Sequence, residues 1–282
     1  MNCVLITVLL ISGLDIFCQA VGEFRCEYKS DQVFEGKVEQ SLLGLKDLQF
    51  THFEDCEDAL KKGFTISGVY RIKPNASARP FPVWCDMNAG AEGGGWIVIQ
   101  TRFDGLVDFE RTWKEYRNGF GNVDSEHWLG NNFIRQITEN YDYELKIDLT
   151  GFTAGEFTSV KYSPFQIGSE DEKYRLYVGT FSNGVIAVQN RLSSHNGSVF
   201  ETKDSDKDVR PTNCADSTRG AWWYVSCYHS NLNGVYMSEG RSTAVMGPQK
   251  ADNVIGIVWR ESFGKSFYSL KRVEMKVRKI RK

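Results

Sequence analysis

Residues 201–234 constrain the fold of this chain most, because no regular helix or strand fits inside them. The segment is too rich in Gly, Pro, Asn, Asp and Ser to keep the apolar spacing of a helix or a strand. It also holds three alternating aspartates, two cysteines thirteen positions apart and the run Trp222-Trp223-Tyr224. Long irregular segments in compact domains are usually functional or disordered. Because the aromatic residues and cysteines argue against disorder, we interpret this segment as the working surface of the molecule.

The aspartates Asp204, Asp206 and Asp208 raise the question of a metal site. The EF-hand calcium loop carries Gly at its sixth position and Glu at its twelfth. Counted from Asp204, those positions hold Val209 and Ala215, so the EF-hand is excluded. A hard-cation site of another kind still fits, because calcium takes six to eight oxygen ligands and an irregular loop supplies carboxylates and carbonyls. The alternative is a solvated acidic turn, balanced by the basic side chains interspersed with the acids.

Motifs inside and outside this segment follow one another in a fixed order. Inside it stand DxDxD, NCA and GAWWYxxCxxSNLNG, and elsewhere the chain carries GVYRIKP, PFPVWCDM, GGGWIVIQTRFDG, FERTWKEYRNGFG, EHWLGNNFI, YELKIDL and YSLKRVEMKVR. With them, residues 53–282 resemble the C-terminal domain of fibrinogen, which ficolins, tachylectins, angiopoietins and tenascins share. The resemblance implies an α+β fold: a single globular domain of short antiparallel sheets and short helices, with a long irregular region for calcium and ligand.

The residue pattern independently favours an α+β domain from residue 53 onward. Residues 55–63 have acids early, lysines late and a final glycine, as a short capped helix does. Residues 143–149 and 273–278 alternate apolar and charged side chains, which indicates half-buried strands. Between 159 and 178 we expect further short strands, interrupted around Pro164.

The resemblance implies a bound calcium ion, Ca2+, at the acidic turn. Its expected ligands are the carboxylates of Asp206 and Asp208 and the backbone carbonyls of Arg210 and Thr212. Together with a disulfide, the ion would fix the irregular loop in one shape.

The resemblance also implies a ligand site beside the calcium loop. In the family's lectins a pocket there holds acetylated groups. In this chain the residues expected to stack on a ligand or hydrogen-bond to it are Tyr224, Tyr228, His229 and Asn231. Acetyl-binding members carry His directly after the second loop cysteine and an aromatic residue four positions after the first, where this chain has Tyr228 and Thr218. Residues 241–247 also lack the expected aromatic wall. The preference for acetylated sugars is therefore open.

The N-terminus predicts a secreted protein. The apolar run VLITVLLISGL is followed by Cys18-Gln19-Ala20, a small-residue cleavage site, although no basic side chain precedes the run. It is too short for a comfortable transmembrane helix, and the rest of the chain offers no 18-residue apolar stretch. We therefore predict a signal peptide over residues 1–20, an extracellular mature chain and no insertion into membranes.

Cysteine usage agrees with an oxidising compartment. Beyond residue 20 stand Cys26, Cys56, Cys85, Cys214 and Cys227, and arithmetic alone allows three pairings of the last four. The position of two cysteines in one irregular loop favours Cys214–Cys227, with Cys56–Cys85 following, and the resemblance implies the same pattern. The remaining Cys26 suggests an interchain disulfide; a capped or free thiol is the alternative.

Residues 21–52 form a separate N-terminal segment. One helical stripe recurs at three- or four-residue intervals, at Val38, Leu42, Leu45 and Leu48. The stripe is too short to establish a coiled coil, so it predicts either a helix packed on its own domain or a small oligomerisation stalk. Together with Cys26, it favours a disulfide-linked homo-oligomer.

Composition and motifs exclude several classes of protein. Hydrophobic residues make up 41% of the chain, which is enough for a sizeable core. A net charge of −2 gives no reason to expect nucleic acid or an anionic membrane as partner. GxSxG and HExxH are absent, and no two histidines stand four positions apart, so we predict no enzymatic activity. The sequons at Asn75 and Asn196 predict a glycoprotein.

Two classes of function remain. The first is a calcium-stabilised lectin of innate immunity, which binds acetylated carbohydrate or a glycoprotein ligand and gains avidity as an oligomer. The second is a fibrinogen-like adhesion or clotting-type protein that binds a peptide or a protein. No collagen-like Gly-X-Y repeat precedes the domain, which weakens a close match to ficolins.

Overall fold

The structure separates into two compact units, residues 1–51 and 52–282. It is a computed structural model that describes residues 16–21, 23–28, 52–88, 90, 93–140, 142–184, 186–205, 213–225, 227–238, 243–244, 254–265 and 268–280.

In the N-terminal unit, β1 (Ile16–Val21) pairs antiparallel with β2 (Glu23–Tyr28). Their register places Cys18 opposite Cys26. Strand β1 spans the predicted cleavage position after residue 20. The helical stripe predicted at 38–48 lies outside the described residues, so the leader, the stalk and the interchain disulfide stay predictions.

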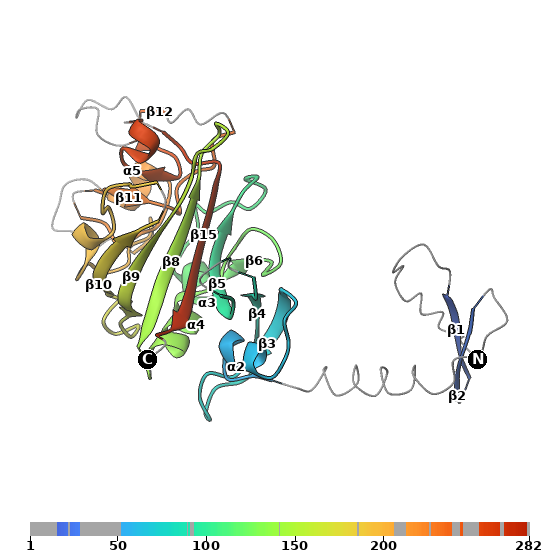
Figure 1. Ribbon diagram of the computed structural model, residues 1–282. Helices are drawn as coiled ribbons and strands as arrows, with labels where there is room; N and C mark the ends of the chain where they lie inside the picture. The colour runs from blue at the N-terminus through green and yellow to red at the C-terminus, as the bar shows by residue number, and fades with distance from the viewer. Residues whose placement is uncertain are drawn as a thin grey trace. The chain divides into compact units, whose positions relative to one another are not determined.

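A nine-stranded antiparallel sheet forms the framework of residues 52–282 (Figure 1). Seven strands follow one another in the order β10, β9, β8, β15, β5, β4, β3, and β7 pairs with both β5 and β6. The bounds are β3 (Gly68–Ile72), β4 (Phe81–Asp86), β5 (Trp96–Arg102), β6 (Phe120–Gly121), β7 (His127–Trp128), β8 (Tyr143–Thr150), β9 (Phe157–Ile167), β10 (Leu176–Asn183) and β15 (Arg272–Lys279). Two small ribbons pair β11 (Ser230–Asn231) with β14 (Val258–Trp259), and β12 (Thr243–Ala244) with β13 (Val254–Ile255). The predicted α+β class is confirmed.

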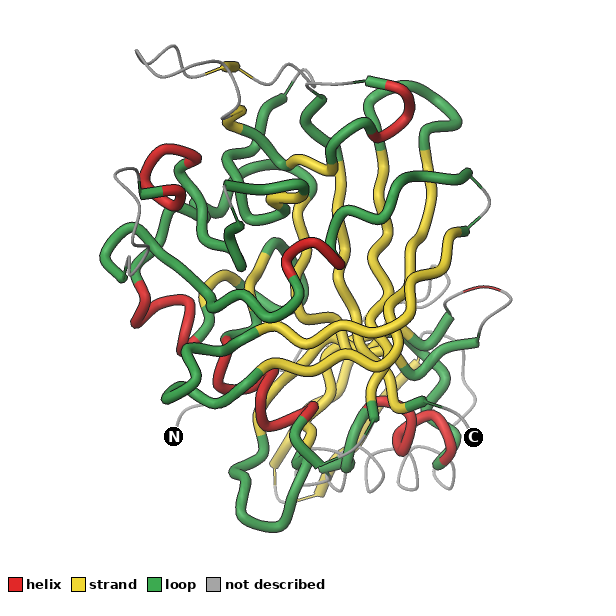
Figure 2. The backbone as a smooth tube through the Cα atoms, turned by 90° about the vertical axis from the view of Figure 1, so that its left-hand side faces the viewer, coloured by secondary structure: helices red, strands yellow, loops and turns green. Residues whose placement is uncertain are grey.

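Short helices surround the strands, and long loops connect them (Figure 2). The helices are α2 (Cys56–Lys61), α3 (Trp113–Asn118), α4 (Asn131–Thr138) and α5 (Cys214–Thr218), with 3-10 turns η2 (Ser193–His195) and η3 (Ser262–Gly264). Helix α2 confirms the predicted cap, because the Asp55 carboxylate accepts a hydrogen bond from Asp58 N at 2.7 Å. Within the described part of the chain, no helix is both long enough and apolar enough to cross a membrane.

The C-terminal strand β15 lies inside the sheet, between β8 and β5 (Figure 1). Its predicted alternation is confirmed on the apolar side, where Val273, Met275 and Val277 are fully buried. A half-buried strand would leave its charged side chains in solvent, but Lys276 is only 3% exposed. The reason is that β4 and β8 bring to it two acids that are distant in sequence, Asp86 and Asp148.

The buried Lys276 ammonium has three carboxylate partners. Its Nζ lies 2.8 Å from Asp86, 2.8 Å from Asp148 and 2.9 Å from Glu274. Burial alone would lower the pKa of Lys276, but the charges of Glu274 and Asp148 outweigh it and raise the pKa. The sheet therefore contains a charged centre that is paired on three sides.

Strand β9 runs through Pro164, where the sequence predicted interrupted short strands. The register against β8 shifts here, with Tyr143 opposite Phe165 but Leu145 opposite Tyr162. Proline is tolerated at such a bulge because no ladder hydrogen bond from its nitrogen is needed. The expected break is therefore a bulge within one long strand.

An aromatic cluster joins the irregular segment to the sheet. The rings of Trp128 and Phe200 stack with centroids 6.0 Å apart, and Phe200 meets Trp223 edge-on at 5.2 Å. Trp222 and Trp223 are 0% exposed, so both indoles belong to the core. Burying such large side chains is worth several kcal/mol, about 3–5 for a Trp replaced by Ala.

Candidate recognition site

The predicted calcium ligands Asp206, Asp208, Arg210 and Thr212 lie outside the described residues, so the calcium site stays a prediction. The first aspartate of the series, Asp204, is described and has a structural role. Its Oδ1 accepts hydrogen bonds from Trp113 N at 2.9 Å and from Thr202 Oγ1 at 2.8 Å. It thereby ties the start of the acidic turn to the first residue of α3.

The two ends of the acidic turn are held together. Asn213 Nδ2 donates to Lys203 O at 3.3 Å, and Asn213 Oδ1 accepts from Asp216 N at 2.9 Å at the start of α5. The Lys203 ammonium lies 3.5 Å from Glu110, which also receives Arg219 Nε at 2.8 Å. The hydrogen bond from Arg219 is the main cause that lowers the pKa of Glu110. Glu110 thus partners two of the basic side chains near the turn.

Two disulfides are present as predicted. Cys214 and Cys227 join with Cα atoms 5.4 Å apart, and Cys56 and Cys85 with Cα atoms 5.5 Å apart. The first lies within a segment that we call the recognition loop, the described residues 213–225 and 227–234. Because this loop has little regular structure, the crosslink is one of the few restraints that fix its path.

Buried polar side chains of the recognition loop form hydrogen bonds with one another. The Tyr224 hydroxyl lies 2.8 Å from Thr218 Oγ1 and donates to Asn231 Oδ1 at 3.4 Å. Thr218 Oγ1 also donates to Cys214 O at 2.8 Å. Burial raises the pKa of Tyr224 well above its usual range, so the phenol stays neutral. These groups shape the loop from inside.

His195 is the residue that sequence reasoning missed. Its ring is fully buried, and Nδ1 lies 2.6 Å from Trp223 O. Its Nε2 accepts from the backbone N–H groups of both His229 and Ser230, at 3.1 and 3.2 Å. Only a ring that is neutral and carries its proton on Nδ1 satisfies all three contacts. Burial, the largest cause, lowers the pKa of His195 to about 4, so the neutral form prevails at pH 7.

We call the buried His195 ring with its three backbone contacts the His195 clamp. The half-buried His229 lies at the outer side of this clamp. Its ring centroid is 6.2 Å from that of His195, and its carbonyl accepts from Arg260 N at 3.1 Å. Burial, and then the charges of Arg260 and Arg191, lower the pKa of His229. At neutral pH it presents one hydrogen-bond donor and one acceptor on an uncharged ring.

The SNLNG motif is held from below by the central strand β5. Gln100 Nε2 donates to Leu232 O at 3.0 Å and to Asn233 Oδ1 at 2.8 Å. Arg102 Nη1 donates to Leu232 O at 3.2 Å and to Gly234 O at 2.8 Å. Burial lowers the pKa of Arg102 to about 10, which leaves it charged. Side chains of the sheet therefore fix the position of the SNLNG backbone.

The structure brings the four predicted ligand residues together but does not expose them equally. Tyr224 is 4%, Tyr228 3% and Asn231 0% exposed, whereas His229 is intermediate. In this conformation His229 is the one of the four that reaches the surface. Asn231 Nδ2 is buried without an acceptor among the described residues. The direct ligand contacts expected of the three buried side chains stay predictions.

Comparison with known proteins gives consistent matches. Residues 52–280 match the family described as "Fibrinogen beta and gamma chains, C-terminal globular domain". Fibrinogen-like protein 1 of Rattus norvegicus is 36% identical over 98% of this chain and 95% of its own. Ficolin-3 of Homo sapiens is 41% identical over 79% of this chain and 70% of its own. Angiopoietin-2 of Bos taurus is also 41% identical, but the chain covers only 43% of that protein.

Solved structures share the fold. The fibrinogen-like globe domain of human ANGPTL2 aligns with a TM-score of 0.72 and 37% identity, over 80% of this chain and 99% of its own. Lamprey fibrin D-dimer, complexed with the peptide Gly-His-Arg-Pro-amide, aligns with a TM-score of 0.72 and 28% identity, over 88% of this chain and 85% of its own. These matches confirm the resemblance seen in the motifs.

Proposed function

Because the chain belongs to the family of the fibrinogen C-terminal globular domain, we propose that it is a non-enzymatic recognition protein that works outside the cell. Two intrachain disulfides support this location, because such bonds persist in oxidising compartments. The signal peptide predicted over residues 1–20 supports it as well.

The His195 clamp is the observation that carries the proposal. One neutral imidazole holds the backbone at both His229 and Ser230, while the Cys214–Cys227 disulfide restrains the same loop. A surface that is fixed before binding loses less conformational entropy when its ligand arrives. The fold thus fixes an irregular loop in one shape, as a recognition site requires.

Calcium is the cofactor that we propose for the acidic turn. Two carboxylates, from Asp206 and Asp208, and two carbonyls, from Arg210 and Thr212, form a set of hard oxygen donors that suits this ion. The hydrogen bond from Asn213 to the carbonyl of Lys203 supports the proposal, because it brings the two ends of the turn together. Bound calcium would neutralise the acids there.

Carbohydrate is the first candidate ligand. The uncharged, half-buried ring of His229 offers a donor and an acceptor, which suits the hydroxyl and acetamido groups of a neutral sugar. The resemblance to lectins of this family supports the same class, and so does the 41% identity to human ficolin-3. A disulfide-linked homo-oligomer, joined through Cys26, would convert weak single-site binding into avidity.

A peptide or protein is the second candidate. Lamprey fibrin, 28% identical, was solved with the peptide Gly-His-Arg-Pro-amide. Thr218 and Tyr228 also stand where acetyl-binding members carry an aromatic residue and a histidine, and Thr218 is bonded within the loop. Both observations favour a ligand other than an acetylated sugar.

Binding of the secreted protein to a glycan array, in calcium and then in chelator, tests the choice. Calcium-dependent capture that is lost in His229→Ala supports the lectin. The matched control is His52→Ala, an exposed histidine away from the loop. If folded, calcium-loaded protein binds no glycan on the array, the lectin hypothesis is contradicted. Binding to immobilised peptides would then favour the second candidate.

A further inference from the structure

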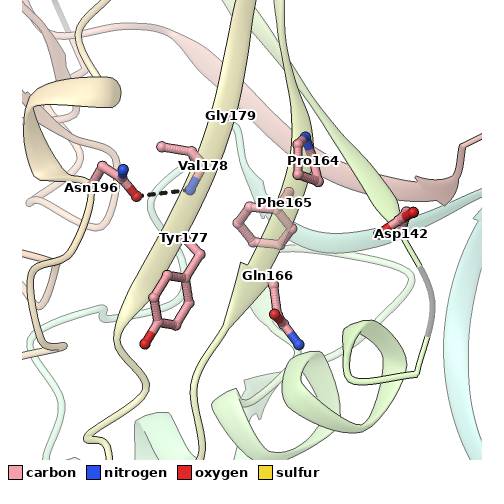
Figure 3. A pocket seen from close by; sticks show the side chains of 8 residues that line it. All are labelled: Asp142, Pro164, Phe165, Gln166, Tyr177, Val178, Gly179 and Asn196. Atoms are coloured by element: carbon pink, nitrogen blue, oxygen red, sulfur yellow. Dashed lines mark hydrogen bonds between the residues drawn. The ribbon is translucent and has the colours of Figure 1, made fainter.

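The sequon at residues 196–198 lies along the outer edge of β10. This strand ends the sheet among the described strands. Leu176 N donates to Ser198 O at 2.9 Å, and Gly197 N donates to Leu176 O at 2.8 Å. Val178 N donates to the side-chain Oδ1 of Asn196 at 3.0 Å (Figure 3). The sequon therefore satisfies edge groups that would otherwise be open to another strand.

The oxygen and the nitrogen of the Asn196 side-chain amide have different surroundings. Its Oδ1 accepts from the strand, while Nδ2, the atom that would carry an N-linked glycan, makes no hydrogen bond among the described residues. The residue is exposed. A glycan on Nδ2 leaves the bond to Val178 intact. Asn75 differs, because it is half-buried and its Nδ2 donates to Glu139 at 3.2 Å.

A hollow of about 270 Å³ opens beside Asn196 on the β9–β10 hairpin (Figure 3). Pro164 at the bulge and Gly179 on the paired strand both line it. A Cβ on Gly179 would lie 2.4 Å from Ser163 O, so only glycine fits there. The lining residues are Asp142, Pro164, Phe165, Gln166, Tyr177, Val178, Gly179 and Asn196.

The chemistry of the hollow suits a single sugar ring. Tyr177 is 41% exposed and offers an aromatic face, on which the C–H side of a sugar packs. The Gln166 amide and the Asp142 carboxylate supply hydrogen-bonding groups for hydroxyls. The volume is below the roughly 300–1,000 Å³ of drug-sized ligand sites, so it matches one ring rather than a longer ligand.

We propose that Asn196 carries an N-linked glycan whose first sugar rests in this hollow against Tyr177. Attached at the sheet edge, the glycan completes the shield that the sequon backbone begins. The proposal rests on the extracellular location proposed above, but not on the ligand class of the recognition loop. A negative glycan array would therefore leave it standing.

The test expresses the full chain in cultured animal cells and analyses the secreted protein by peptide mass spectrometry. We expect a hexosamine-containing glycan on Asn196. It should be absent from Ser198→Ala, which keeps the edge bonds because only the Ser198 carbonyl takes part. Asn196→Ala loses both the glycan and the bond to Val178, so it should melt below Ser198→Ala.

Release of the glycan by a peptide N-glycosidase from the folded protein tests the resting place. Release from wild type should be several times slower than from Tyr177→Ser, with equal rates after denaturation. If Tyr177→Ser is not secreted, Gln166→Ala replaces it. Failure of secretion, an unmodified Asn196, or equal native release rates in wild type and variant would overturn the proposal.

Discussion

The nine-stranded sheet and the recognition loop are held by different physical means. In the sheet, hydrogen-bonded ladders and buried alternating residues repeat, so many small contributions add up. Residues 143–150, for example, pair with strands on both sides. The loop depends on a disulfide, on His195 and on the side chains of Gln100 and Arg102. The loop can therefore be loosened by a single substitution that leaves most of the sheet in place.

The exception within the sheet is the buried ammonium of Lys276, and it predicts the largest effect. Replacing it in Lys276→Met leaves three carboxylates without their shared partner, which costs about 3–5 kcal/mol of unfolding free energy. Urea denaturation measures the loss. The control is Lys62→Met, whose exposed pair with Asp58 contributes at most about 1 kcal/mol. Equal losses in both variants would contradict the account.

Removing the loop disulfide comes next. The double change Cys214→Ser and Cys227→Ser should cost about 3 kcal/mol by the chain-entropy argument for a loop of this length. The loss should be local, because the sheet has its own ladders. Hydrogen exchange should quicken across residues 213–234 and stay slow in β8 and β15. Uniform acceleration would show that loop and sheet unfold as one unit.

Removal of calcium should destabilise the acidic turn next to the recognition loop. If calcium exceeds its dissociation constant a hundredfold, chelation costs about 2.7 kcal/mol, and the melting temperature falls. Asp206→Ala should abolish the response to chelator. Asp204→Ala should lower stability in both conditions, since Asp204 bonds to Trp113 and Thr202. An unchanged melt in chelator, with Asp206→Ala like wild type, would remove calcium from the account.

Acid should weaken the loop before the sheet. The unfolded chain protonates His195 below its ordinary pKa of 6.5, while the folded chain resists protonation until about pH 4. Stability is therefore lost as the pH falls through that window, by about 2 kcal/mol between pH 7 and 5. His195→Gln should lack this part of the pH dependence. His229→Ala controls for the second histidine, and identical pH profiles in wild type and His195→Gln would contradict the clamp.

The smallest effect belongs to the helix cap at the end of the acidic turn. Asn213→Ala removes the acceptor for Asp216 N and the donor to Lys203 O, and should cost about 1 kcal/mol. Thermal melting checks this against Asn122→Ala, an exposed asparagine outside the loop. The calcium response of Asn213→Ala should also weaken. A melt like that of Asn122→Ala would mean that the cap does not order the turn.

The fold was largely predictable because its signals are local. Alternation in residues 143–149 and the Asp55 cap specify a strand and a helix from neighbouring residues alone. The bulge at Pro164 and the burial of Lys276 were not predictable in this way. Each depends on partners from other strands, and no spacing in the sequence reveals those partners.

The candidate site was only partly predictable. The cysteine pairing followed from position, and the SNLNG motif marked the right segment. His195 escaped because it acts on backbone groups 34 and 35 residues away, and a lone histidine has no motif. Residue type alone could not show that Tyr224 and Asn231 face inward, where they bond to each other.

The most direct test of the recognition loop is a hydrogen-exchange footprint of the protein with the best ligand from the glycan array or the peptide screen. Exchange at residues 227–234 should slow when ligand is bound, while exchange in the edge strand β3, residues 68–72, should stay unchanged. Protection confined to the sheet, with none at His229 or Ser230, would contradict it.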